Sequence, residues 1–92
     1  MAQYEIDINN CGASPSSQTL KVGDQVKFCS TDSKSYKLTG LGNVFEGGHG
    51  HIDVAAGGCT QYYTVTGTKG NYGYNVGPDC PAQDPPEIII DD

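Results

Sequence analysis

Apolar and polar residues alternate in short runs along most of the chain, with the two-residue period of β-strands that bury one face. Residues 4–8, which read Tyr-Glu-Ile-Asp-Ile, are the clearest example. No segment has ten residues of helical periodicity, so the pattern predicts an all-β sandwich or small barrel of about seven to eight strands. The expected strands are residues 4–8, 20–22, 26–29, 36–38, 51–54, 59–66, 72–76 and 87–90.

Glycine-rich and polar segments separate these runs and predict how they connect. Gly23-Asp24 reads as a two-residue turn, which predicts a hairpin between 20–22 and 26–29. Residues 13–17 read as a loop. The apolar run at 87–90 predicts a central strand.

The charge balance narrows the classes of partner. The chain has 92 residues, with eleven Asp and Glu against five Lys and Arg, and a formal net charge of −6. This length predicts one domain over residues 1–92, ending in the acidic pair 91–92. Because phosphate recognition depends on clustered basic residues, we expect no nucleic-acid partner. The sequence also shows no signal peptide or membrane span, and we expect no membrane insertion.

Four cysteines, Cys11, Cys29, Cys59 and Cys80, form an even set in a short, loop-rich chain. Such a set favours two disulfides and an oxidising, extracytoplasmic compartment that is periplasmic, secreted or at the cell surface. Three pairings are possible, and the spacing alone does not choose among them. A zinc site with four thiolates is the alternative, although the chain has no CxxC pair.

His49 and His51 are the conspicuous metal-capable pair. In an extended segment, residues two apart point to the same side, so both imidazoles could hold copper or zinc. Glu46 or Asp53 could add an oxygen ligand. The simpler interpretation is that a glycine-rich loop carries polar residues without binding an ion.

Three tyrosines, Tyr36, Tyr72 and Tyr74, could form an exposed aromatic patch for a partner or a sugar. We favour the alternative that they face the core, with hydroxyls at its rim. Tyr72, Tyr74 and Val76 are expected to share one face of a strand.

Candidate sites of other kinds are weaker. Asp79, Asp84 and Glu87 lack the dense spacing of a calcium loop. No GxSxG elbow or other pairing of a nucleophile with a base is present, so we do not expect an enzyme.

The order of several motifs resembles the cupredoxins, the small blue-copper proteins. Residues 20–28 resemble the family's L-x-V-G-D-x-V-x-F motif, and residues 70–76 resemble its G-x-Y-x-Y-x-C strand. Residues 56–58, followed by 62–65, resemble the glycine-rich turn and aromatic strand before the copper loop. Residues 87–91 correspond to the closing strand. The resemblance covers most of residues 4–91 and implies a Greek-key β-sandwich.

The resemblance also implies where a type-1 copper site would lie. The first histidine position is Tyr36, the cysteine position is Val76, and the second histidine position is Asp79. No methionine follows Met1. A type-1 site needs two imidazoles and a thiolate, so we expect these copper positions to be vacated.

Cupredoxin topology would gather all four cysteines at the copper end of the sandwich. The pairing that the resemblance favours is Cys29–Cys59 with Cys11–Cys80. The Asp79-Cys80 step also resembles the His-Cys step of phytocyanins, a cupredoxin branch in which that cysteine is bridged.

These expectations lead to a non-catalytic binding or structural module, stabilised by disulfides and without a blue-copper site. It would bind another protein or assemble with itself, and it needs no cofactor. The alternative is copper or zinc binding, or electron transfer, through a non-type-1 site around His49 and His51.

Overall fold

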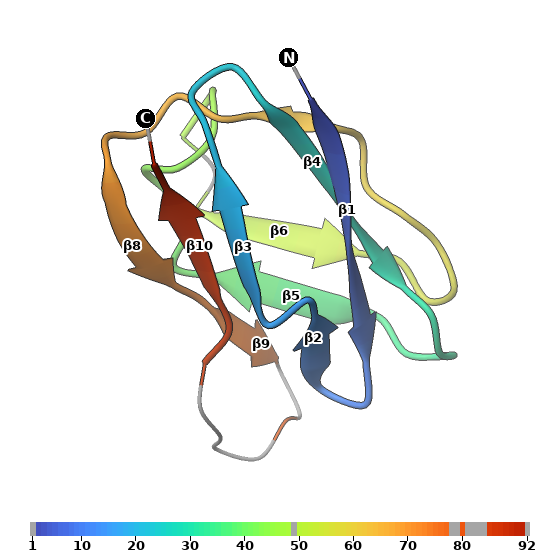
Figure 1. Ribbon diagram of the computed structural model, residues 1–92. Coiled ribbons are helices and arrows are strands. Elements are labelled where there is room, and N and C mark those ends of the chain that lie inside the picture. Colours follow the sequence, from blue (N-terminus) through green and yellow to red (C-terminus); the bar gives the residue numbers. More distant parts are fainter. Residues whose placement is uncertain (1, 49, 78–79, 81–84, 92) are drawn as a thin grey trace.

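A computed structural model describes residues 2–48, 50–77, 80 and 85–91, and it confirms the all-β prediction (Figure 1). Within these residues the chain forms more strands than the seven to eight expected and no helix. No apolar helix of membrane-spanning length occurs in this part of the chain. The ten strands are β1 (Gln3–Asn9), β2 (Gly12–Ser14), β3 (Ser17–Leu20), β4 (Gln25–Ser30), β5 (Tyr36–Thr39), β6 (His51–Val54), β7 (Tyr63–Thr64), β8 (Gly70–Gly73), β9 (Asn75–Gly77) and β10 (Glu87–Ile90).

The strands form two packed layers. One layer is a sheet of order β2-β1-β4-β7, in which β1 and β4 are parallel. The other consists of two three-stranded sheets, β3-β10-β8 and β6-β5-β9. Only Tyr74 separates β8 from β9, so these two sheets are halves of one bent layer (Figure 1). β10 lies between β3 and β8, which confirms the prediction of a central closing strand.

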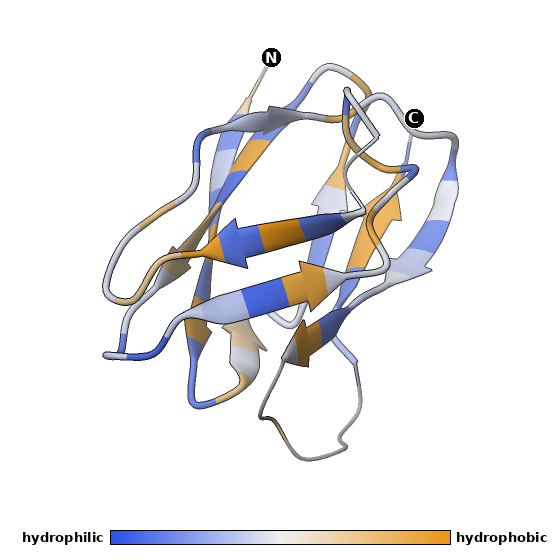
Figure 2. Cartoon of the chain, turned by 180° about the vertical axis from the view of Figure 1, so that it is seen from behind, coloured by the Kyte–Doolittle hydropathy of each residue, from blue (hydrophilic) through white to orange (hydrophobic). Residues whose placement is uncertain are grey.

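The core fills the space between the layers because alternate residues of each strand point inward. Figure 2 shows this alternation of hydrophilic and hydrophobic residues along β5 and β6. The Phe28 ring packs edge-on against Phe45 and Tyr74, with centroids 6.1 and 6.0 Å apart. Each large apolar side chain buried in this way contributes about 1.5–3 kcal/mol to stability. The fully buried set includes Ile6, Ile8, Leu20, Val26, Leu38, Ile52, Val54, Ile88 and Ile90.

The hairpin predicted at Gly23-Asp24 is wrong. β3 pairs with β10 in one layer, whereas β4 pairs with β1 and β7 in the other. The turn therefore carries the chain across the sandwich. The Asp24 carboxylate fixes it by accepting hydrogen bonds from the backbone N–H groups of Lys21 at 2.9 Å and Ala2 at 3.1 Å.

The tight two-residue hairpin lies instead between β1 and β2. β1 and β2 are antiparallel with Asn9 opposite Gly12, so residues 13–17, expected as a loop, include most of β2. The long strand expected at 59–66 is reduced to β7, flanked by isolated bridges. The Thr60 hydroxyl accepts the Phe28 N–H bond at 3.0 Å in place of a backbone carbonyl, which interrupts the ladder.

The strand expected at residues 72–76 is also divided, at Tyr74. The Tyr74 N–H donates to the Pro86 carbonyl at 2.9 Å, and its side chain is 1% exposed. Tyr72 and Val76, on either side, are half-buried and lie in different sheets. The bend lets one segment pair with β10 at its start and with β5 at its end.

Candidate functional site

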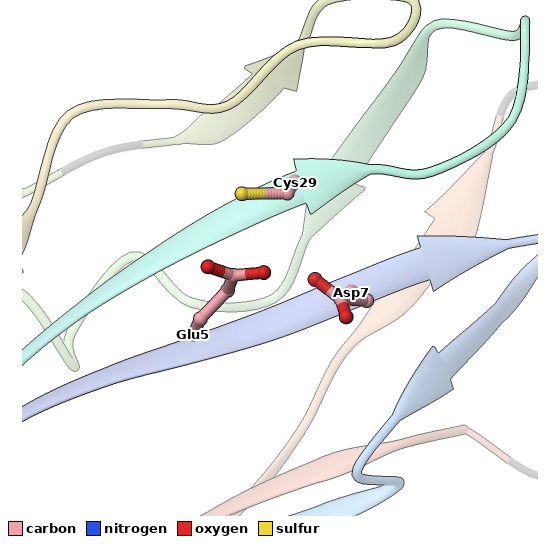
Figure 3. A group of neighbouring side chains, drawn as sticks. All are labelled: Glu5, Asp7 and Cys29. Carbon is pink, nitrogen blue, oxygen red and sulfur yellow. The ribbon is translucent and has the colours of Figure 1, made fainter.

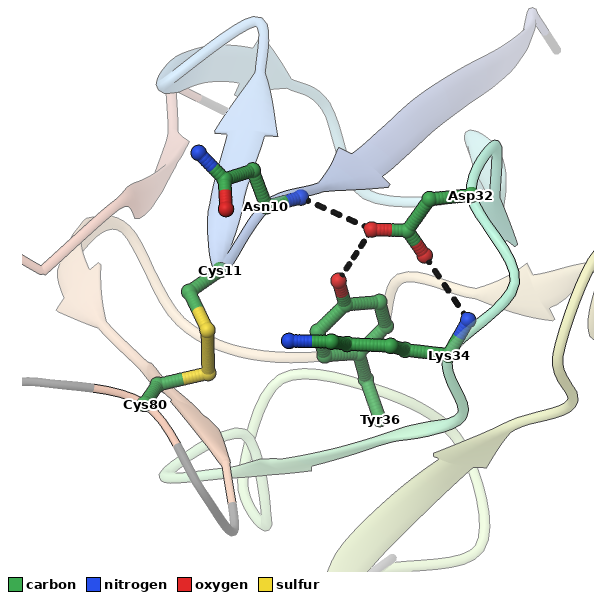
Figure 4. The surroundings of a disulfide bond; sticks show 6 residues. All are labelled: Asn10, Cys11, Asp32, Lys34, Tyr36 and Cys80. Carbon is green, nitrogen blue, oxygen red and sulfur yellow. Dashed lines mark hydrogen bonds between the residues drawn. A yellow bond between two sulfur atoms is a disulfide. The ribbon is translucent and has the colours of Figure 1, made fainter.

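The turn between β1 and β2 forms one end of the sandwich and is linked covalently to the chain beyond β9. Asn10 and Cys11 have φ values of 52° and 65°, the left-handed conformation that two-residue hairpins require. Asparagine tolerates this conformation, whereas cysteine adopts it at a cost. Cys11 is 6% exposed and forms a disulfide with Cys80, 69 residues away. The disulfide therefore fixes the turn against the opposite layer (Figure 4).

Asp32 lies beside this turn, and its side chain accepts hydrogen bonds from the neighbouring loops. Its Oδ2 atom accepts the Asn10 N–H at 2.9 Å and the Tyr36 hydroxyl at 2.6 Å. Its Oδ1 atom accepts the Lys34 N–H at 3.0 Å (Figure 4). One carboxylate thus joins the β1–β2 turn, the loop before β5 and the first residue of β5.

These contacts fix the protonation states of both side chains. The hydrogen bond from Asn10, followed by that from Tyr36, holds the Asp32 pKa well below its usual value. Burial, followed by the contact with the Asp32 carboxylate, raises the pKa of Tyr36. At neutral pH, Asp32 is therefore a carboxylate anion that accepts the hydrogen bond, and Tyr36 is a neutral phenol that donates it.

Tyr36 and Val76, which the motif resemblance assigns to copper-ligand positions, do not have the chemistry of type-1 ligands. Tyr36 is 4% exposed, and its hydroxyl is already bonded to Asp32. Val76 supplies no donor atom and lies opposite Leu38 in β5, not opposite Tyr36. The sulfurs of Cys11 and Cys80 are joined, so neither supplies a thiolate. Asp79 lies outside the described residues.

The second disulfide, Cys29–Cys59, completes the pairing that the resemblance implied. β4 runs parallel to β1, so Cys29 lies towards the same end of the molecule as Cys11. However, Cys29 points to the outer face of the sheet, whereas Val26 and Phe28 point inward. The bridge therefore fastens residues 58–60 onto the side of β4 and does not link loops across the end of the sandwich. The Ser30 N–H also donates to the Gly58 carbonyl at 2.8 Å.

Two carboxylates, which the sequence analysis did not single out, lie next to this second disulfide. Glu5 and Asp7 share the outer face of β1, and Asp7 is directly opposite Cys29 (Figure 3). One ligand atom from each of the three residues lies within 4.8 Å of the others. The E-x-D spacing is visible in the sequence, but the parallel pairing that brings it to Cys29 is not.

Few hydrogen-bond donors lie near the carboxylates of Glu5 and Asp7. Within the described residues, the buried Oδ1 atom of Asp7 has no hydrogen-bond partner. A hydrogen bond with Asp7, and then its charge, raise the pKa of Glu5, while Lys27 at 3.7 Å opposes the shift. Two carboxyl groups this close disfavour each other's ionisation, which is the main reason that the pKa of Glu5 is raised.

Of the histidine pair, His51 is described and His49 lies outside the described residues. His51 is on the exposed face of β6, with its Nε2 atom 3.5 Å from Asp53 Oδ2. Asp53 is opposite Lys37 in β5. The Glu46 side chain is exposed.

The remaining candidates are also placed. Tyr36 and Tyr74 face the core, at 4% and 1% exposed, but the Tyr74 hydroxyl is buried without a hydrogen-bond partner among the described residues and does not lie at the rim. Tyr72 is half-buried, and its hydroxyl donates to the Thr68 carbonyl at 2.6 Å. Glu87 begins β10, while Asp84, its companion in the weak calcium candidate, lies outside the described residues.

A shallow pocket opens beside Tyr36, where β5 begins and β6 ends. Its volume is about 380 Å³, within the range of small-ligand and side-chain pockets. The Lys37–Asp53 pair gives it one charge of each sign. The residues lining it are Ser35, Tyr36, Lys37, Asp53, Val54 and Ala55.

No protein-family model and no curated protein sequence matches the chain. Solved structures do match. A pseudoazurin from Sinorhizobium meliltoi superposes with a TM-score of 0.71 at 18% identity, over 100% of this chain and 76% of its own. An oxidized amicyanin mutant gives 0.69 at 16% identity, over 95% and 80%. A purple cupredoxin from Nitrosopumilus maritimus gives 0.62 at 18% identity, over 95% and 98%. At these identities the similarity establishes architecture, and the chain has a cupredoxin-like fold.

Proposed function

We propose that this protein is a non-catalytic, cupredoxin-like binding or structural module, in which covalent and hydrogen-bonded links replace the type-1 copper site. The observation that supports this most is the state of Tyr36. The motif resemblance assigns Tyr36 to the first ligand position, and Tyr36 is buried with its hydroxyl donating to Asp32 at 2.6 Å. A metal ion there would have to break a charge-assisted hydrogen bond and displace a core side chain.

Two features of the molecule favour a protein partner in an extracytoplasmic compartment. Two disulfides persist where the environment is oxidising. The pocket beside Tyr36 offers a rigid, partly apolar recess with the Lys37–Asp53 pair at its edge. Side chains of a partner, or of a second copy, would enter such a recess.

Copper loading tests the proposal directly. We expect that Cu(II) added to the oxidised protein produces no intense visible thiolate-to-copper band. Intact mass should be lower than that of the reduced chain by four hydrogens, two for each disulfide. An intense blue or purple colour on loading would overturn the proposal, as would four free thiols.

The alternative is a non-type-1 copper or zinc site at His51. It is favoured by the 3.5 Å approach of His51 Nε2 to Asp53 Oδ2 on an exposed strand. Cu(II) and Zn(II) titrations of the wild type and of His51→Ala separate the two functions. A one-to-one site lost in His51→Ala would establish the alternative, whereas equal weak binding by both proteins would support the module.

A further inference from the structure

The outer face of the sheet formed by β1 and β4 carries a group of oxygen and sulfur atoms that the proposed function does not use. Glu5 and Asp7 point outward from β1, and Cys29 faces them from β4 (Figure 3). Cys59 adds a second sulfur, bonded to that of Cys29 at 2.06 Å. The face therefore brings together two carboxylates and two sulfurs.

In the oxidised protein this group has no thiolate. A disulfide sulfur is a poor metal ligand, and the two carboxylates alone make an ordinary acidic surface. The group nevertheless lacks hydrogen-bond donors, because Asp7 Oδ1 is buried without a hydrogen-bond partner among the described residues. Lys27, 3.7 Å from Glu5, is the cation that faces the pair from β4.

We propose that reduction of the Cys29–Cys59 disulfide opens a metal site, formed by Glu5, Asp7, Cys29 and Cys59, for a thiophilic divalent cation such as Zn²⁺. Two thiolates and two carboxylates make a four-coordinate set of the kind that zinc accepts. The unpartnered oxygen of Asp7 would gain its missing partner in the metal.

The redox step is balanced by a phosphine as reductant. Phosphorus gives two electrons to the sulfur–sulfur bond, a water oxygen forms the phosphine oxide, and the two water hydrogens leave both cysteines as thiols. Metal binding then releases the thiol protons, because the thiolate is the ligand.

The geometry requires the carboxylate oxygens to move slightly closer to Cys29 and the two sulfurs, 2.06 Å apart in the disulfide, to move apart after reduction. Bonds of about 2.0–2.3 Å to zinc separate tetrahedral ligands by about 3.3–3.8 Å. The ligand atoms of Glu5, Asp7 and Cys29 already lie within 4.8 Å of one another. Glu5 and Cys59 are exposed, so an ion can reach the group from solvent, while the ladder between β1 and β4 fixes the backbone of Asp7 and Cys29.

Co²⁺ and Zn²⁺ titrations of the phosphine-reduced protein test this inference. Tetrahedral cobalt bound by thiolate has an ultraviolet charge-transfer band, and zinc should displace it. We expect one equivalent to bind to the reduced protein and no such band in the oxidised protein. Circular dichroism checks that the reduced protein remains folded.

Matched variants assign the ligands. Cys29→Ser with Cys59→Ser should abolish the band, while Cys11→Ser with Cys80→Ser should keep it. Glu5→Gln and Asp7→Asn, which retain every cysteine, should each weaken binding by at least about tenfold, the scale expected for a well-placed group at a metal site. Glu46→Gln is the control for loss of an exposed carboxylate elsewhere and should bind normally.

Three results would overturn the inference: no charge-transfer band in the reduced wild type, a band that survives in Cys29→Ser with Cys59→Ser, or affinities unchanged in both carboxylate variants. The comparison of the carboxylate variants with the wild type remains valid even if removal of Cys11 and Cys80 prevents folding, because these variants retain every cysteine. None of these results bears on type-1 copper, so the proposed function is tested separately.

Discussion

The two disulfides of this molecule have opposite electrostatic surroundings. Beside Cys11–Cys80, the carboxylate of Asp32 accepts four hydrogen bonds and its pKa is lowered. Beside Cys29–Cys59, Glu5 and Asp7 crowd each other and the pKa of Glu5 is raised. The same chemical group is thus stabilised as an anion in one region and disfavoured as an anion in the other.

The difference follows from where backbone donors are free. Asp32 lies in a loop, and the N–H groups of Asn10 and Lys34 point at it because they have no place in a ladder. Glu5 and Asp7 lie on β1, which pairs with β4 along its length and with β2 at its end. The N–H groups of a strand between two neighbours are used by the ladders, so side chains on its face find few donors.

Removing each disulfide should give the largest effect and should distinguish the two regions. In the chain-entropy description, Cys11→Ala with Cys80→Ala costs about 4.4 kcal/mol, because the loop closed is long. Cys29→Ala with Cys59→Ala, which opens the shorter loop, costs about 3.6 kcal/mol. Urea unfolding without reductant measures both, and a larger loss for the second pair would contradict this ordering.

Acid should affect the two regions with opposite sign. The lowered pKa of Asp32 means that its contribution is present above the ordinary aspartate pKa of about 3.9 and is lost as pH falls below it. Asp32→Asn should therefore destabilise at neutral pH and reduce the loss of stability in acid. The raised pKa of Glu5 means that its favourable contribution is present in acid and is lost as pH rises through the folded value.

Glu5→Gln should accordingly increase stability at neutral pH relative to acid. Urea midpoints at neutral pH and at about pH 3 compare both variants with the wild type. Shifts of the same sign in Asp32→Asn and Glu5→Gln would show that the two carboxyl groups do not differ as described.

Tyr36→Phe removes one of the four hydrogen bonds that the Asp32 carboxylate accepts and should have a smaller effect. The phenol is buried and donates to an anion, so its loss should cost about 1–2 kcal/mol. The matched control is Tyr72→Phe, whose hydroxyl is near the surface and should cost less. Thermal unfolding of the two variants measures both losses of stability. Equal losses would show that the Tyr36 hydroxyl has no special role.

The rate of disulfide reduction should show the smallest difference. The carboxylates beside Cys29 repel an anionic thiolate, so Glu5→Gln with Asp7→Asn should speed its attack on Cys29–Cys59 by about two- to fivefold. A neutral phosphine should show no such change, and the Cys11–Cys80 rate should stay the same. Mass mapping of alkylated cysteines measures each rate, and equal acceleration with both reductants would rule out the electrostatic explanation.

Much of the fold could be predicted from local pattern. The alternation at residues 4–8 identified β1 and its buried face, and the apolar run at 87–90 identified a central strand. Both predictions succeed because the pattern of apolar residues along a strand indicates whether one or both of its faces are buried. The number of strands was less predictable, because the bend at Tyr74 depends on which neighbours the segment finds on each side.

The candidate site was less accessible to such reasoning. Motif order suggested Tyr36 as a copper-ligand position, but its burial in the core and its hydrogen bond to Asp32 could not be predicted in this way. Asp32 is one polar residue among several in its loop, and nothing local marks it as the acceptor for Asn10, 22 residues earlier.

By itself, the sequence determined that the chain is all-β, where most strands lie, and that four cysteines are available to staple them. Only the tertiary structure decided that Gly23-Asp24 crosses between layers. It also decided that β1 and β4 pair in parallel, which places Glu5 and Asp7 beside Cys29. The physical reason is that a two-residue period specifies which face of a strand is buried but not which strand lies next to it. The neighbour is selected by how all the buried faces pack together in one core.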